Sequence, residues 1–162
     1  LMKQKTLHIF LGGIAAVLII FAVAIFRTLL YGSRKPLLPT ANLVLAGETF
    51  LVELARSAVE KVLGLSGREG LEKRGGMLFL FDTPAIQNFW MKGMKFPIDI
   101  IWIRGDRVVG FAENAQPEAD KKLWELKIHS SPEPADKVLE VSAGTAASLN
   151  VKVGDKNLEH TK

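Results

Sequence analysis

The pattern of apolar and polar positions divides the chain into one long apolar segment near its start and a region of short apolar runs after it. Residues 9–26 form a stretch of 18 with no charged or polar side chain. At about 1.5 Å per residue, a helix of this length spans roughly 27 Å, close to the roughly 30 Å hydrocarbon core of a bilayer. The pattern therefore predicts a single transmembrane helix within an apolar span of about residues 7–30.

This segment has two interpretations. As a signal anchor it would hold a single-pass protein in the cell membrane, with residues 7–30 in contact with the lipid bilayer. As a signal peptide it would combine Lys3 and Lys5, an apolar run and a cleavage site after Ala24, which would release a secreted or periplasmic domain. The apolar run continues through Ile25 and Phe26, which favours the anchor, and both interpretations place the domain outside the cytoplasm.

The remaining pattern defines the domain limits. We expect the membrane anchor or signal segment at residues 1–35, a linker containing proline at 36–41, a β domain at 42–157 and a polar tail at 158–162.

The β domain is predicted from short apolar runs separated by turns rich in Gly and Pro. Two strands are expected around the turn at Ala46-Gly47, and further strands at 76–81, 86–91, 97–103, 107–115, 123–128 and 137–142. A turn is expected at 82–85. Because no long helices alternate with these runs, we expect a mainly β fold, a compact β-sandwich or barrel with one or two short helices.

Two short helices fit between the strands. Ser57-Ala58-Val59-Glu60 has the sequence of a capping box, in which the Ser hydroxyl and the Glu carboxylate each accept a backbone N–H. The helix that follows is expected to turn Val59, Val62 and Leu63 inward and to end at Gly64. A second helix is expected at 143–149.

Charge and cysteine content narrow the class of partner. The formal net charge is +4, but five of the 21 Lys and Arg residues precede Ala41, and residues 41–162 carry 16 basic and 17 acidic side chains. The basic excess therefore flanks the apolar segment, and we expect no nucleic-acid partner. The absence of cysteine excludes disulfides and thiolate chemistry. With no glycine-rich phosphate loop and no cluster of metal ligands, we expect no cofactor and no metal.

The densest stretch, residues 75–103, supplies the candidate site. In PIDIIWI, alternation sends Ile98, Ile100 and Trp102 to one face, and Asp99 with two isoleucines to the other. A carboxylate inside an apolar strand is costly unless it is paired, or its pKa is raised for a purpose. Aromatic walls with a few polar groups suit a ligand pocket, although the same aromatic residues also serve as core. The candidate ligand-binding residues are Trp90, Lys92 and Asp99, with Arg56 and Arg74 from the preceding segments.

Three functions are compatible with this pattern. The first is a membrane-tethered extracytoplasmic domain that binds a small molecule, a glycan or an envelope protein. The second is a hydrolase-type enzyme that uses Asp99 or Glu113 as acid or base. The third is a structural or assembly module without a ligand.

Four segments together carry a family resemblance: VELARSAVEKVLGLSGREGLEKRGGMLFLF, FWMKGMKFPIDIIWI, RVVGFAENAQP and SPEPADKVLEVSAGTAASLNVKVGD. Over about residues 50–155 they resemble the domain of unknown function 192 family, also called uncharacterised protein family 0127. The resemblance implies a compact, mostly β domain of jelly-roll-like type, often behind a signal peptide or single membrane segment. It implies no activity, cofactor or catalytic residue. Where this family usually reads FWMKN, the chain has Gly93, which keeps only the backbone freedom of that position.

Overall fold

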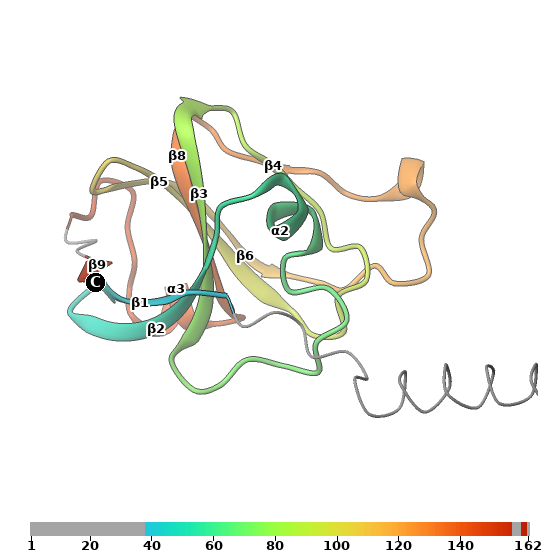
Figure 1. The fold of residues 1–162 in the computed structure, drawn as a ribbon, viewed down its shortest axis with the longest axis horizontal. Helices are drawn as coiled ribbons and strands as arrows, with labels where there is room; N and C mark the ends of the chain where they lie inside the picture. The colour runs from blue at the N-terminus through green and yellow to red at the C-terminus, as the bar shows by residue number, and fades with distance from the viewer. Residues whose placement is uncertain (1–37, 157–159, 162) are drawn as a thin grey trace, which may run out of the picture. The chain divides into compact units, whose positions relative to one another are not determined.

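The computed structural model describes residues 38–156 and 160–161, and its regular structure is mainly β, built around one large sheet (Figure 1). This sheet has seven strands in the order β6-β5-β8-β3-β2-β1-β9. Their bounds are β1 Thr40–Leu45, β2 Glu48–Ala55, β3 Gly75–Ala85, β5 Ile98–Arg104, β6 Arg107–Ala115, β8 Ala135–Ser142 and β9 His160–Thr161. A second sheet pairs β4 Asn88–Phe89 with β7 His129–Ser130. The helical elements described are α2 Ala58–Leu63, α3 Thr145–Ser148 and the 3-10 helix η1 Leu123–Glu125.

The mainly β class with short helices is confirmed, but the described strands do not form the two facing sheets of the expected sandwich. After β2 the chain passes through α2 and a loop, and then returns as β3 parallel to β2. Because this crossover adds β3 to the same sheet, the strands build one mixed, open sheet and a two-stranded ribbon.

Each face of the large sheet carries its own hydrophobic cluster. The first cluster lies between the sheet and α3 and includes Leu43, Val52 and Leu139. The second includes Met77, Phe79 and Ile100 on the opposite face, which is the side of α2 and β4 in Figure 1. A strand with both faces covered is apolar along most of its length, which explains the run IIWI at residues 100–103 of β5.

The alternation predicted for β5 is confirmed. Ile98, Ile100 and Trp102 belong to the second cluster, whereas Ile101 and Ile103 belong to the first. The tight turn that follows, at Gly105, is held by Asp136, whose two carboxylate oxygens each accept from the Gly105 N–H at 3.1 Å.

The helix α2 begins at the predicted capping box and ends at Gly64. The prediction that one face of this helix points into the core is wrong. Val59, Val62 and Leu63 remain 68%, 68% and 53% exposed, and α2 buries none of its own residues. The chain instead inserts Leu65, which follows the helix and is 1% exposed, into the second cluster.

Two other predicted elements also differ. No turn interrupts residues 82–85, since β3 continues to Ala85 with a shift in its pairing to β8 between Leu80 and Ala85. The alternating segment 123–128 is not a strand, because it opens with the 3-10 helix η1.

The C-terminal part of the domain packs on two strands that are far apart in the sheet order. Val108 of β6 donates its N–H to the carbonyl of Asp155 at 3.0 Å, and β9 pairs with β1. Residues 160 and 161, expected in a polar tail, therefore belong to the sheet.

The predicted transmembrane segment lies outside the described residues, as do the expected anchor limits at 1–35. Among the helices that are described, none is long and apolar enough to cross a membrane.

Candidate functional site

The candidate site is centred on Glu140, in the middle of β8. Its cross-strand partners are Met77 on β3 and Ile100 on β5, and Met77 is paired in turn with Glu53 on β2. Directly paired residues share a face, so Glu53, Met77, Glu140 and Ile100 form one row across four strands on the face of the second cluster. This row places two carboxyl groups on an otherwise apolar surface.

Glu53 is neutralised by Arg68, which comes from the loop after α2. The guanidinium makes a forked ion pair, with one nitrogen bonded to Glu53 Oε1 and the other 2.8 Å from Oε2. This bond raises the pKa of Arg68. Such two-pronged pairing fixes the orientation of the guanidinium as well as its charge.

Glu140 has no comparable partner. The residue is 5% exposed, and its Oε2 atom has no hydrogen-bond partner among the described residues. Burial raises the pKa of Glu140 to about 8, although the nearby charge of Arg68 acts in the opposite direction. Near pH 7 the side chain is therefore mostly a neutral carboxylic acid, which can both donate and accept a hydrogen bond.

A pocket of about 180 Å³ is lined by Glu140 and by residues of α2, β3 and the segment around β4. Its floor includes Phe79 and Met94, which are buried in the second cluster. Its lining also includes Val62 and Trp90, which remain 68% and 43% exposed and mark its mouth. A dry cavity of about 150 Å³ accommodates a molecule the size of benzene, so this pocket suits a small ligand or one end of a larger ligand.

Aromatic rings form much of the pocket wall. The rings of Phe79 and Phe89 meet edge to face, with centroids 5.0 Å apart and an interplanar angle of 89°. At the rim, the Lys61 ammonium lies 4.3 Å from the centroid of the Phe81 ring. The rings therefore form a rigid apolar wall with Glu140 as its acidic group.

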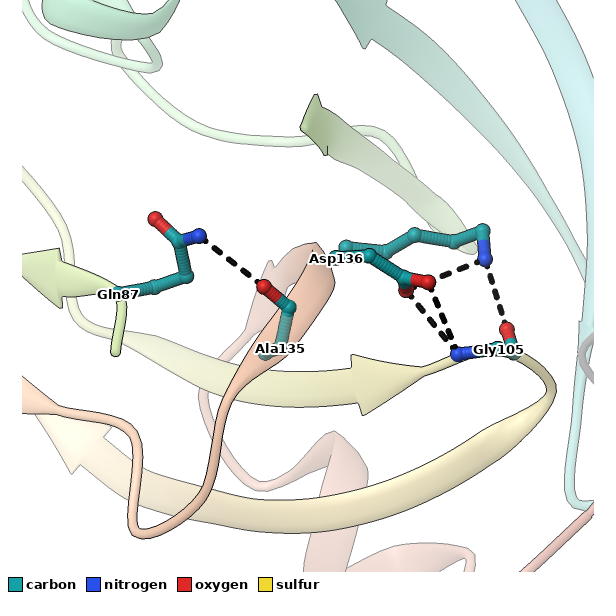
Figure 2. A network of polar contacts seen from close by, with 5 residues as sticks. Gln87, Gly105, Ala135 and Asp136 are labelled. Carbon is teal, nitrogen blue, oxygen red and sulfur yellow. Dashed lines mark hydrogen bonds and ion pairs between the residues drawn. The ribbon is translucent and has the colours of Figure 1, made fainter. Parts of the chain in front are cut away.

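One wall of the pocket is fixed by Gln87, which is 8% exposed. Figure 2 shows its side-chain amide donating to the carbonyl of Ala135, at 3.0 Å. Its backbone N–H donates to the Ser131 hydroxyl at 2.9 Å. These bonds attach the segment before β4 to the start of β8, so the wall and Glu140 keep their relative positions.

The structure brings together only two of the five ligand-binding residues predicted from the sequence. Trp90 and Lys92 line a hollow of about 360 Å³ that adjoins the pocket and shares Val62, Ser66 and Trp90 with it. Ligand contact by Trp90 and Lys92 stays a prediction.

Asp99 lies on the opposite face of the sheet and is fully buried. Its Oδ1 accepts the Asn114 N–H and its Oδ2 accepts the Ala146 N–H, each at 2.8 Å. Backbone amides thus satisfy the carboxylate, which joins β5 to the end of β6 and to the first turn of α3. Among the pockets described above, neither is lined by Asp99.

The two predicted arginines lie elsewhere. Arg74 is ion-paired with Glu48 at 2.6 Å in a separate hollow of about 340 Å³. Arg56 is exposed beside the capping box, where its N–H donates to Glu60. Glu113, the other carboxylate of the hydrolase hypothesis, is exposed on β6.

Within residues 38–156 and 160–161, no three His, Asp or Glu side chains are placed to hold a metal ion. The pocket combines one buried carboxyl group with aromatic surface.

Glu140 was missed by the sequence analysis because in KVLEVS it occupies a polar position of an alternating strand, which usually faces solvent. The signal that drew attention to Asp99, a carboxylate flanked by apolar residues, was equally present in VLEVS.

The fold and the site define a small, mainly β domain that carries a buried acidic group in a pocket beside a short helix. The chain belongs to the DUF192 family, described as uncharacterized ACR, since the family model matches residues 41–158. This match confirms the family resemblance of the sequence. A comparison with curated proteins finds no match.

The solved structures that are similar to this chain include a Novosphingobium and a Sinorhizobium protein. A protein of unknown function from Novosphingobium aromaticivorans DSM 12444 is 34% identical, with a TM-score of 0.65, and the alignment covers 76% of this chain and 88% of that one. A Sinorhizobium meliloti 1021 protein, suggested to be a transcription regulator, is 32% identical with the same TM-score, 0.65, over 75% of this chain and 92% of that one.

Proposed function

We propose that this domain is a binding module for a small organic molecule, which enters the pocket beside α2 and is recognised by Glu140. The observation that carries the proposal is the buried Oε2 atom of Glu140, which has no hydrogen-bond partner among the described residues and belongs to a residue that lines the pocket. Leaving a buried polar atom unpaired costs about 1–3 kcal/mol. A ligand that bonds to this atom recovers that free energy.

Binding is favoured over hydrolysis because the pocket lacks the second acid of a carboxylate pair. Glu140 is the only Asp or Glu among its described lining residues. Asp99 uses both oxygens to hold backbone amides on the other face. The ring-lined wall, by contrast, is typical of small-ligand sites.

The description of the Sinorhizobium meliloti protein does not extend to a DNA-binding proposal for this chain. Residues 41–162 have one acidic side chain more than basic ones, whereas DNA binding relies on an excess of Lys and Arg.

The proposal is tested by a ligand screen on the full-length chain in dodecyl maltoside, a detergent without charge or nitrogen. Sets of small alcohols, amides, amines and sugars are added, and both the melting temperature and the tryptophan fluorescence are followed, because Trp90 lies at the mouth. We expect a subset to raise the melting temperature. A screen in which no compound does so contradicts the proposal and supports the structural module.

Site specificity is tested with two matched variants. At pH 8.5, where Glu140 is mostly ionised, Glu140→Gln is expected to weaken binding of a hit about tenfold, since a hydrogen bond to a charged group contributes about 1.5–3 kcal/mol. Glu72→Gln changes an exposed carboxylate outside the pocket lining and is expected to have no effect.

We also propose that residues 7–30 tether the domain to a membrane and that the domain faces away from the cytoplasm. The support is the uncharged 18-residue stretch at 9–26. The test is protease treatment of intact cells or spheroplasts that express the chain with a C-terminal tag. Loss of the tag is expected; a protected tag in a membrane fraction would contradict the orientation.

A further inference from the structure

We propose that the ligand of this pocket is an organic ammonium ion, with Glu140 as its counter-ion and the aromatic rings as its wall. This inference rests on the proposed binding function and names the chemical class of the ligand. The charges near Glu140, the rings around it and the size of the pocket support this ligand class.

In the part of the chain that the structure describes, no cation is bonded to Glu140. Arg68 is committed to Glu53 through both terminal nitrogens of its guanidinium. Lys61, which lines the pocket, lies over the ring of Phe81. The row on the sheet thus holds two carboxyl groups and one bonded guanidinium, and a ligand with one positive charge balances the ionised form of Glu140.

The aromatic rings of the pocket suit a positively charged ligand. Cations are attracted to the faces of aromatic rings within about 6 Å, and sites for quaternary ammonium groups are commonly built from several rings. Phe79, Phe81, Phe89 and Trp90 all line the pocket. The contact between Lys61 and Phe81 shows that the face of one of these rings already accepts an ammonium group.

The size of the pocket limits the ligand. A volume of about 180 Å³ suits a compact head group with several methyl or methylene groups. A sugar ring would leave most of its hydroxyl groups against phenyl rings, unpaired. A compact ammonium ion presents apolar carbon to the rings and its charge to one carboxylate.

A pH dependence follows from this arrangement. The groups that face Glu140 are Arg68 from the loop, Glu53 from β2 and Lys61 from α2. A permanent cation binds the ionised form of Glu140, which is the minority form below about pH 8. Affinity is therefore expected to rise about tenfold per pH unit up to about pH 8 and then to level off. Each binding event below that pH releases about one proton.

The experiment compares choline with 3,3-dimethyl-1-butanol, in which carbon replaces the charged nitrogen. Calorimetric titrations of the full-length chain in dodecyl maltoside are run from pH 6 to 9, in buffers of different ionisation enthalpy. We expect choline to bind more tightly than the neutral compound at pH 8.5, with the pH dependence and proton release described above. Phosphocholine in place of choline separates two sources of the ammonium group. Retained affinity indicates that the group belongs to a lipid head group. Lost affinity indicates a free ammonium compound without a phosphate.

Variants complete the test. Glu140→Gln is expected to remove both the preference for choline and the proton release, whereas Glu72→Gln, which changes an exposed carboxylate outside the pocket lining, keeps them. Equal or tighter binding of the neutral compound, or affinity for choline that does not change with pH, would overturn the ammonium assignment. So would the failure of choline to bind at pH 8.5. If screened compounds still bind in a manner that depends on Glu140, the proposed function survives that result.

Discussion

Glu140 lies between Met77 and Ile100 at the centre of the sheet, and its pKa of about 8 links the stability of the domain to pH. In the unfolded chain the pKa of a Glu is about 4.5. Between these values the folded state holds a proton that the unfolded state has lost. The contribution of this group is therefore fully present below about pH 4.5 and is lost as pH rises through about 8.

We expect the free energy of unfolding to decrease between pH 5 and 8 by up to about 1.4 kcal/mol per pH unit from this residue alone. Urea titrations across that range measure it. In Glu140→Gln, which cannot ionise, the decrease should be smaller by this amount. Parallel slopes in the two proteins would show that Glu140 has an ordinary pKa.

Asp99 acts through its two backbone amides, and its replacement is expected to weaken the fold rather than binding. In Asp99→Asn one oxygen becomes an NH₂ group that faces an N–H donor, at Asn114 or at Ala146. We expect a loss of about 1–3 kcal/mol in urea unfolding. The affinity of the folded protein for a pocket ligand should stay the same. A change in affinity without a loss of stability would restore the ligand-binding role predicted from the sequence.

Gly93 has a φ of +70°, in the left-handed region that Gly and Asn tolerate better than other residues. This conformation is compatible with the Asn that the family resemblance places there. We expect Gly93→Asn to lower the melting temperature less than Gly93→Val, since a β-branched residue is strained at this φ, and an added Cβ already lies 3.3 Å from the Cβ of Ser66. Equal melting temperatures for the two variants would contradict this account.

At the scale of elements, α2 is held by its ends rather than by burial. Its capping box is complete, with the Glu60 N–H donating to the Ser57 hydroxyl at 3.3 Å and the Ser57 N–H donating to the Glu60 carboxylate at 2.8 Å. None of the residues of the helix itself is buried. Such an element opens locally at a lower free energy than the core strands.

We expect Ser57→Ala, which removes the cap, to destabilise α2 by about 1 kcal/mol. Hydrogen exchange of the α2 amides should become faster while exchange in β3, β5 and β8 stays unchanged. Because α2 forms part of the pocket, ligand affinity should also fall. Faster exchange throughout the sheet would show instead that α2 unfolds only with the whole domain.

Sequence patterns predicted the strands well where local periodicity decides the outcome. Side chains of a strand alternate between its two faces, so the sequence alone assigns each residue of β5 to a face. The structure confirms this assignment for both faces. The turn at Ala46-Gly47 and the capping box were predicted for the same reason, since both depend on neighbouring residues alone.

Non-local packing explains the failures. The spacing of Val59 and Val62 indicates an apolar face but not the surface that covers it, and in the structure both side chains are exposed. The strand order and the parallel return of β3 follow from a crossover that periodicity does not encode. The burial of Glu140 has the same origin, because its surroundings, such as Phe79 on β3 and the segment around β4, are brought to β8 only by the fold.

At the scale of the whole molecule, the large sheet separates two kinds of polar group. On one face Asp99 fastens backbone segments together, and on the other Glu140 belongs to the lining of a pocket. Under the proposed function, the structural acid and the ligand-binding acid lie on opposite faces of a single sheet. Substitutions at the two acids should therefore separate effects on stability from effects on affinity.

The two-residue strand β9 has a consequence for solubility. It pairs Thr161 with Asn42 and His160 with Leu43, and so covers the middle of the outer edge of β1. An uncovered strand edge is a template for joining another chain.

We expect a chain that stops after Lys156 to self-associate in a concentration-dependent way in analytical ultracentrifugation. The double variant His160→Ala and Thr161→Ala, which keeps the backbone pairing, should stay monodisperse. The few C-terminal residues of β9 would then protect the domain from edge-to-edge aggregation.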